Sequence, residues 1–373
     1  EITTRLVGSE MCIRDRLLAL LSVFSLQFNA NNLMGQCLYT LRGTPIPFVV
    51  RTLVGGLIGI AVTFISIRYL RIGYLGFVLG SALNYMFCFF SFIYPLWMKE
   101  KLYPRIEISK VRIFKLLKIS LPVVPHALGF LLLSSSSRII MALYEIPIED
   151  IGIYSNGYIL GDYITIVTTA LAFALAPYMQ TTFRSENYMC YRFLFFLCQS
   201  IALVSIFIFC LWMPEIYSIL IRNESLQESM VISQISCFAN CVFPLYVFMS
   251  NICFIKKDTM QLLWLVFIPG LLNIILLLIF IPLFGYRVAV ITTLISYWTQ
   301  MFIPFFIRYY KEQISLWLGN RSKLVELFLI SVFALVTSII LSKYFMAKLS
   351  MTLLIMVIII SNISKISYKL KFL

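Results

Sequence analysis

Charged residues are scarce in this chain. Only 12% of its 373 residues are Asp, Glu, Lys or Arg, whereas a water-soluble domain carries about 25%. So few charges cannot coat a surface that faces water, so a soluble globular fold is excluded. Instead, 61% of the residues are hydrophobic and the mean hydropathy is +0.94. These values indicate that lipid surrounds most of the protein.

Metal-binding and catalytic patterns are also missing. The chain has one histidine, His126, and its nine cysteines form no Cys-x-x-Cys pair. Most cysteines lie within apolar runs, where free thiols behave as small hydrophobic residues. We therefore predict no disulfide framework, no metal site and no cofactor. No Gly-x-Ser-x-Gly, Walker or His-Glu-x-x-His motif is present, so we predict that the protein is not an enzyme.

Long apolar runs fill almost the whole chain. A helix needs about 20 apolar residues to cross the hydrocarbon core of a bilayer. We therefore predict an all-α polytopic membrane protein with about eleven transmembrane helices. The predicted spans are 17–40, 46–68, 73–97, 115–143, 151–178, 191–213, 229–253, 260–282, 286–307, 324–342 and 347–363.

Lys and Arg are distributed unevenly between the connecting segments. If the C-terminal tail is cytoplasmic, nineteen of them lie inside and six outside, which is the bias that the positive-inside rule describes. This bias accounts for the net charge of +14, and no soluble basic domain is present to bind nucleic acid. We predict a multi-pass protein of the inner (plasma) membrane with a cytoplasmic C-terminus.

A weak internal repeat indicates two helical bundles. Residues 73–85 read GYLGFVLGSALNY and residues 285–297 read GYRVAVITTLISY, and both are predicted to run from outside to inside. Same-direction repeats are typical of transporters built from two bundles. We predict a partial N-terminal bundle at 17–98, a cytoplasmic linker at 99–112 and a six-helix bundle at 113–310. Residues 311–373 would add a C-terminal helical hairpin and a basic cytoplasmic tail.

Residues 1–16 do not fit this organisation. They carry mixed charges, and the string LVGSEMCIRDR at 6–16 resembles translated sequencing-adapter text, so we expect a non-native leader. An odd number of spans with the C-terminus inside places the start of the first span outside. We therefore expect a fragment that lacks an odd number of N-terminal helices, whose first bundle is incomplete and which does not transport by itself.

Polar residues at membrane depth are the candidate binding residues, because they are costly in lipid and tend to face a cavity or a partner. The span at 115–143 carries prolines at its start and then Ser134 to Ser137 and Arg138, so we predict that it bends and lines the space between the bundles. The guanidinium of Arg138 suits an anion such as a pyrophosphate. Alternatively, Arg138 forms an ion pair with Asp162 in the next span. An unpaired Asp162 could carry a proton.

Other polar residues allow two interpretations each. His126 is a hydrogen-bonded interior residue or a proton relay, and Arg51 contacts lipid phosphates or substrate. Asn32, in the patch FNANNLMGQ, lines the cavity or bonds a neighbouring helix. Tyr154, Tyr158 and Tyr163 belong to an aromatic belt at the outer face or stack on sugar rings. The predicted substrate-binding residues are Arg138, Asp162, Ser134, Ser137, His126, Asn32 and Arg51.

Two stretches resemble a known family. The first stretch resembles the seventh and eighth helices of Wzx-type O-antigen and polysaccharide flippases. It reads ISLPVVPHALGFLLLSSSSRIIMALYEIPIEDIGIYSNGYILGDYITIV and is followed by ALAPYM. The second stretch is similar to the eleventh and twelfth helices of the same flippases and reads LLNIILLLIFIPLFGYRVAVITTLISY. These flippases belong to the multidrug/oligosaccharidyl-lipid/polysaccharide exporter superfamily. One departure is Ser137, which stands where family members often have an acidic residue, so a local partner for Arg138 is missing.

The resemblance implies fourteen helices with both ends inside, of which the first three would be absent here. It also implies flipping of an undecaprenyl-pyrophosphate-linked oligosaccharide to the outer leaflet for surface polysaccharide, such as the O-antigen of lipopolysaccharide. The implied partners are this lipid-linked oligosaccharide, membrane lipids and a proton or sodium gradient. The rival functions are a cation-coupled multidrug exporter, a lipid II flippase and a membrane-embedded polysaccharide polymerase.

Overall fold

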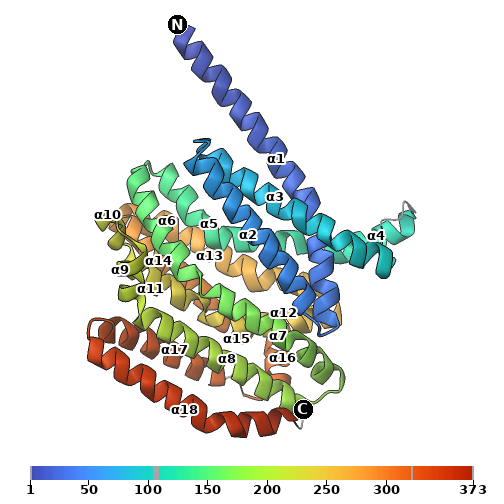
Figure 1. Ribbon diagram of the computed structural model, residues 1–373. Coiled ribbons are helices and arrows are strands. Elements are labelled where there is room, and N and C mark those ends of the chain that lie inside the picture. Colours follow the sequence, from blue (N-terminus) through green and yellow to red (C-terminus); the bar gives the residue numbers. More distant parts are fainter. Residues whose placement is uncertain (1, 104–108, 122, 321, 372–373) are drawn as a thin grey trace. The chain divides into compact units, whose positions relative to one another are not determined.

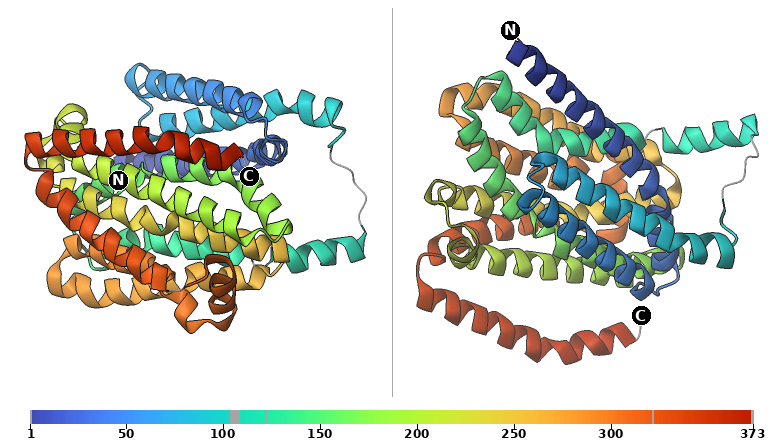
Figure 2. Two further views of the ribbon diagram at one scale, coloured as in Figure 1. Left: turned by 90° about the horizontal axis from the view of Figure 1, so that it is seen from below. Right: turned by 45° about the horizontal axis from the view of Figure 1, so that its top comes forward.

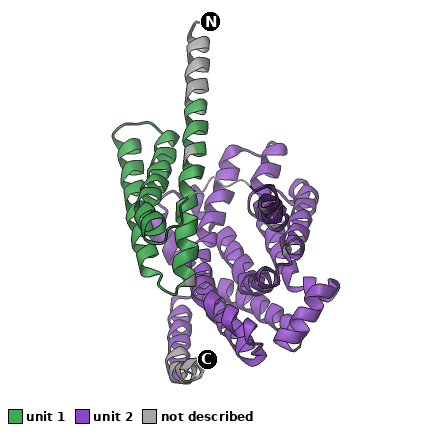
Figure 3. Ribbon diagram, turned by 90° about the vertical axis from the view of Figure 1, so that its right-hand side faces the viewer, with its two compact units in different colours: residues 1–108 green, residues 109–373 purple. Residues whose placement is uncertain are grey.

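The computed structural model describes the backbone of residues 2–103, 109–121, 123–320 and 322–371, and most side chains between Arg16 and Ser361. The chain divides into two compact units, Glu1–Ile108 and Ser109–Leu373 (Figure 3), and the division falls within the predicted linker at 99–112. Residues 104–108 of that linker, Pro122, and the basic side chains of the C-terminal tail lie outside the described part. Each unit is described by itself.

Helices make up nearly all of the described residues, which contain no strand (Figure 1), so the predicted all-α class is confirmed. Unit 1 consists of α1 (Ile2–Leu41), α2 (Ile46–Arg68), α3 (Tyr74–Ile93) and the π-helical turn η1 (Tyr94–Lys99). Unit 2 consists of α4 (Lys110–Ser120), α5 (Val123–Leu143), α6 (Ile148–Asp162), α7 (Thr165–Arg184), α8 (Tyr188–Leu211), α9 (Met213–Leu220), α10 (Glu224–Gln227), α11 (Met230–Ala239), η2 (Asn240–Val242), α12 (Phe243–Lys256), α13 (Thr259–Phe284), η3 (Tyr286–Val288), α14 (Ala289–Trp298), η4 (Thr299–Met301), α15 (Ile303–Phe306), α16 (Arg308–Leu318), α17 (Ser322–Leu341) and α18 (Phe345–Lys371).

Nine helical segments of the described chain are long and apolar enough to cross a membrane, and they coincide with nine of the eleven predicted spans. Many of their large apolar side chains are exposed, among them Leu57, Phe64 and Phe333. Water would not tolerate so much exposed apolar surface, whereas lipid would. The polytopic membrane class follows from this combination of length, composition and exposure.

The other two predicted spans differ from the expectation. The run at 286–307 is not one helix, because it breaks into η3, α14, η4 and α15. Proline at 304 cannot continue a helix from the preceding turn, and the hydroxyls of Thr293 and Ser296 bond carbonyls one turn back, which bends helices. The run at 347–363 lies in α18, whose described apolar part is the 14 residues Phe345–Ile358.

Two of the membrane segments are interrupted near their middle. The segment Ile148–Arg184 contains α6 and α7, which meet at Tyr163 and Ile164. The segment Glu224–Lys256 contains α11 and α12, which are joined by the short 3-10 helix η2. Broken helices at membrane depth occur where backbone groups are buried in protein or line a cavity, so these interruptions mark polar parts of unit 2.

In unit 1, α3 packs against both α1 and α2. In unit 2, α5 lies along α13, α6 lies along α11, and α14 contacts both α11 and α13. The largest cluster of buried side chains includes Tyr191, Phe195, Phe248 and Trp317, which bring α8, α12 and α16 together. This cluster and the helix pairs around it give unit 2 a core of its own.

The last two helices, α17 and α18, follow each other through a short turn (orange-red and red in Figure 2). An ion pair attaches α18 to the rest of unit 2: the Lys348 ammonium contacts the Glu215 carboxylate at the start of α9. The Lys348 side chain is only 4% exposed and also lies over the ring of Trp212. A buried cation thus holds the C-terminal helix in place.

Candidate functional site

Arg138 lies five residues before the end of α5, so its Cα is about 8 Å along the helix from that end. Its Nε donates to Ser155 Oγ at 3.0 Å and its Nη1 to the Ser134 carbonyl at 3.4 Å. The guanidinium carbon stands 5.2 Å from the ring centre of Tyr158. All of these partners are uncharged, and none of the ion pairs among the described residues includes Arg138.

The alternative ion pair between Arg138 and Asp162 is therefore not formed. Asp162 is the last residue of α6, about 21 Å along that helix from Ile148, which places it deep in the membrane segment. Its Oδ1 accepts a hydrogen bond of 3.2 Å from Asn240 Nδ2. Thr165 Oγ1 donates to the Asp162 carbonyl at 2.7 Å, which satisfies a backbone group that the end of α6 leaves free.

The contact between Asp162 and Asn240 joins the two interrupted helices at their breaks. Asn240 begins η2, where α11 gives way to α12, and Asp162 ends α6, before α7 begins. Asp162 stands out in the sequence as a charge within an apolar run, whereas Asn240 does not. A pattern that could have revealed this neighbourhood is Gly-x-x-x-Gly at Gly157 and Gly161, which lets two membrane helices approach closely. The hydroxyl of Ser233 on α11 donates to the Gly157 carbonyl at 2.7 Å.

The serines of α5 differ in burial and in the groups that they contact. Ser134 is half-buried and shares the face of Arg138, four residues away, whereas Ser136 and Ser137 are buried against other helices. Ser137 Oγ lies 3.4 Å from Thr293 Oγ1 on α14. The structure thus places Ser134 beside Arg138, and it places Ser137 in a contact between α5 and α14.

A buried asparagine joins α5 to two neighbouring helices. Asn273 of α13 is fully buried, and its Nδ2 donates to the Leu133 carbonyl at 3.3 Å and to Ser136 Oγ at 3.1 Å. Its Oδ1 accepts from Thr293 and Ser296, each at 3.5 Å. These hydrogen bonds hold α5, α13 and α14 together. The sequence does not reveal them, because the bonded residues are 20 to 140 positions apart.

His126 is a hydrogen-bonded interior residue in the structure. Its Nδ1 lies 2.8 Å from the Leu262 carbonyl and its Nε2 lies 3.0 Å from Tyr246 Oη. The imidazole is stacked on the Tyr246 ring, with 6.0 Å between ring centres, and is 5% exposed. These contacts connect α5 with α12 and α13, and they occupy both ring nitrogens.

Tyr154 and Tyr158 are not part of an exposed aromatic belt. They are 1% and 6% exposed and stack on each other with ring centres 6.0 Å apart. The belt interpretation is wrong for these two residues, because α6 turns them toward α11 and α14, inside unit 2. Tyr158 instead supplies the aromatic face beside Arg138, an attractive position for a cation.

Asn32 and Arg51 belong to unit 1. Asn32 Nδ2 donates to Asn29 Oδ1 at 3.3 Å, and its own buried Oδ1 has no hydrogen-bond partner among the described residues. Arg51 donates to the carbonyls of Pro47 at 2.7 Å and Ser91 at 3.3 Å, and it lies over the Phe92 ring. Arg51 therefore fastens α2 to α3.

The fold and these contacts define a class: an all-helical, polytopic membrane protein with interrupted spans and an uncompensated arginine in one of them. A solved structure with a similar fold is described as the outward-facing conformation of a multidrug resistance MATE family transporter of the MOP superfamily. The TM-score is 0.63 with 14% sequence identity, over 82% of this chain and 70% of that chain. This likeness is one of fold. No protein-family model and no curated protein matches the chain.

Proposed function

We propose that this protein is a transporter that moves a lipid-linked oligosaccharide, carried on undecaprenyl pyrophosphate, from the inner to the outer leaflet of the plasma membrane, as Wzx-type flippases do. The neighbour of similar fold is itself a transporter. The positive-inside bias supports the plasma membrane and a cytoplasmic C-terminus. The pyrophosphate is the part of this substrate that distinguishes it from a neutral or cationic molecule.

The observation that carries the proposal is that Arg138 forms no ion pair with a carboxylate of the described residues. A cation inside a membrane segment is costly unless it meets an anion or water. Here Ser155, Ser134 and Tyr158 hold the guanidinium in place without neutralising it. Such a group suits the oxygens of a pyrophosphate, which accept the parallel hydrogen bonds of a guanidinium.

Asp162 has a separate role in this proposal. It is a carboxylate at the junction of two interrupted helices, a position where transporters bind coupling ions. Its contact with Asn240 is one neutral hydrogen bond, which leaves the carboxylate able to take up a proton or contact a sodium ion. We propose that one of these ions drives transport through Asp162.

A multidrug exporter is the second candidate, because the structural neighbour is described as one. Many drugs are cations, and Asp162 would then contact the drug while Arg138 would repel it. Charge therefore separates the two candidates. A flippase needs Arg138 for its anionic substrate, whereas an exporter of cations needs Asp162 for its substrate and gains nothing from Arg138.

Binding measurements on the purified protein in nanodiscs test the proposal. We expect undecaprenyl pyrophosphate to bind about 10- to 100-fold more weakly to Arg138→Gln, because a hydrogen-bonded charge contributes about 1.5–3 kcal/mol. Arg287→Gln is the control, since Arg287 is exposed and paired with Glu228, and it should bind like the wild type. Equal binding by Arg138→Gln and wild type would remove Arg138 from the site.

Transport assays in a bacterial strain without its own flippase complete the test. Because we expect this chain to be a fragment, a full-length gene that carries its sequence is expressed. That gene should restore surface polysaccharide, Arg138→Gln in it should lower the amount, and transport by Asp162→Asn should no longer respond when the ion gradient is collapsed. Export of a cationic dye that depends on Asp162, without any effect on surface polysaccharide, would instead establish the multidrug function.

A further inference from the structure

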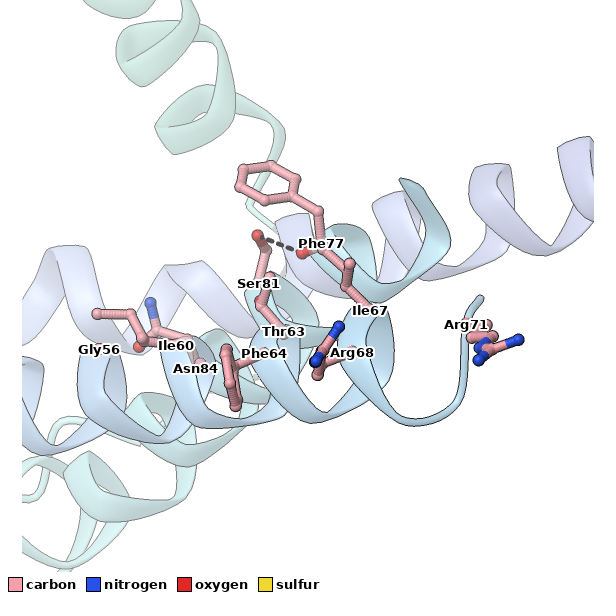
Figure 4. A pocket seen from close by; sticks show the side chains of 12 residues that line it. Gly56, Ile60, Thr63, Phe64, Ile67, Arg68, Arg71, Phe77, Ser81 and Asn84 are labelled. Carbon is pink, nitrogen blue, oxygen red and sulfur yellow. Dashed lines mark hydrogen bonds between the residues drawn. The ribbon is translucent and has the colours of Figure 1, made fainter. Parts of the chain in front are cut away.

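A groove runs along α2 and α3 in unit 1. Its volume is about 820 Å³, within the range of about 300–1,000 Å³ that is usual for ligand sites. Its walls are the side chains of Ile60, Phe64 and Ile67 from α2 and Phe77 from α3, all of which are about half exposed or more. Figure 4 shows Arg68 and Arg71 toward one end of this groove and Gly56 near the other.

The arginine end lies where the span meets the membrane surface. Arg68 is the last residue of the membrane segment Ile46–Arg68, and Arg71 follows it in the loop before α3. Both side chains are exposed, and neither has a hydrogen bond or an ion pair with the other described residues. These two are among only six Lys and Arg predicted on the outer side, where the positive-inside rule gives no reason for a pair of cations.

The length of the groove matches one leaflet. From Gly56 to Arg68 the α2 helix rises about 18 Å, and half of the hydrocarbon core is about 15 Å thick. The groove thus begins at headgroup level and extends to the middle of the bilayer. A glycine lies at the deep end, and a Cβ atom at Gly56 would meet no other atom within 4 Å. The space beside Gly56 is therefore open.

We propose that this groove binds an anionic phospholipid such as phosphatidylglycerol, with the phosphate at Arg68 and Arg71 and one acyl chain between α2 and α3. The two arginines favour a lipid as the occupant. A packed transmembrane helix would cover the apolar walls but would leave both arginines without a partner, whereas a phospholipid covers the walls with its acyl chain and pairs its phosphate with the arginines. Thr63 also lines the groove and offers a hydroxyl to the glycerol ester region, whereas the Ser81 hydroxyl donates to the Phe77 carbonyl at 3.0 Å. This proposal is independent of the transport function.

Native mass spectrometry of the full chain in equal amounts of phosphatidylglycerol and phosphatidylethanolamine tests the headgroup. Each arginine near a membrane surface favours an anionic lipid roughly fivefold. We therefore expect the wild type to retain phosphatidylglycerol with about 25-fold preference, and Arg68→Gln with Arg71→Gln to lose that preference. Arg222→Gln is the matched control, because Arg222 is also exposed and predicted on the outer side. Equal retention of the two lipids by the wild type would overturn the proposal, and so would an unchanged preference in the double variant.

A second pair of variants tests the acyl chain. Gly56→Leu places a side chain into the open groove without a clash and favours the helix over glycine, so the protein should fold and lose the lipid. Gly152→Leu is the control, since a Cβ atom at Gly152 on α6 also meets nothing within 4 Å. Retained lipid in Gly56→Leu would show that the arginines bind lipid without the groove. Capture of another protein chain by a cross-linker at Phe77→Cys would show that a helix occupies it. Either result would overturn the proposal.

Discussion

Replacing Gly161 with alanine tests how α6 and α11 are held together. A Cβ atom at Gly161 would lie 1.9 Å from Ser236 Oγ, 2.3 Å from the Ser233 carbonyl oxygen and 3.0 Å from the Cys237 nitrogen. The serine hydroxyl can rotate away, but the carbonyl and the nitrogen belong to the backbone of α11. The two helices must therefore separate before an alanine fits, which also pulls Asp162, the next residue, away from Asn240.

Two opposing contributions set the size of the effect. Overpacking a well-packed contact costs about 1–3 kcal/mol, and the backbone contacts here favour the upper end of that range. Alanine is favoured over glycine inside a helix by about 1 kcal/mol, which offsets part of the cost. A net loss of about 2 kcal/mol remains, which corresponds to a fall in Tm of roughly 4–8 °C for a unit of this size.

The buried cysteines supply the assay. Seven of the eight described cysteines are buried, including Cys237 beside the contact, so a thiol-reactive fluorescent dye reports unfolding as the protein is heated in detergent. Gly152→Ala on the same helix is the matched control, because its Cβ atom would meet nothing within 4 Å. Its Tm should equal that of the wild type or exceed it slightly.

A rescue variant sharpens the interpretation. Adding Ser236→Ala to Gly161→Ala removes the contact with Oγ but leaves the one with the Ser233 carbonyl, so we expect the Tm to recover only in part. A Tm for Gly161→Ala within about 1 °C of the control would refute the reasoning, since a separation of the helices cannot be that inexpensive. Full recovery in the double variant would show that only the serine hydroxyl opposes the methyl group.

Two further predictions concern ion pairs. Lys348→Met should lower the free energy of unfolding by about 2–4 kcal/mol, because it leaves the Glu215 carboxylate without its partner. Adding Glu215→Gln should restore part of the loss, whereas Lys343→Met at an exposed position should have little effect. Equal Tm values for the two lysine variants would contradict this prediction. In unit 1, Arg42 donates two hydrogen bonds to Glu100, at 2.6 and 2.5 Å, which lower the pKa of Glu100 below its ordinary value of 4.5. Because the pKa of Glu100 is lower in the folded than in the unfolded protein, the pair stabilises unit 1 above pH 4.5 and loses this contribution as the pH falls through the folded pKa. The difference in Tm between wild type and Glu100→Gln should therefore vanish in acid. A difference that persists there would show that the ion pair with Arg42 is not its cause.

The sequence by itself determined the class and most of the helices of this protein. Apolar runs of about 20 residues have one stable form in lipid, a helix that satisfies its own backbone groups, so hydropathy alone located nine membrane segments. It also identified the residues that cannot face lipid, Arg138 and Asp162 among them. These conclusions depend on local composition, which a sequence displays directly.

The partners of those residues were decided only by the tertiary structure. Arg138 and Asp162 do not bond each other: Arg138 bonds Ser155, whereas Asp162 bonds Asn240, which is 78 residues away. The run at 286–307 has the length of a span, yet its hydroxyls and its proline break it into short helices.

Helix orientation explains the remaining differences. Four consecutive serines look alike in sequence, but a helix turns about 100° per residue, so each serine meets a different neighbour. The Ser134 carbonyl accepts from Arg138, whereas the Ser137 hydroxyl lies beside Thr293. The same rotation buries Tyr154 and Tyr158 rather than exposing them as a belt. Which face of a helix meets another helix depends on contacts between distant residues such as Gly161 and Ser236, and no local property of the sequence specifies them.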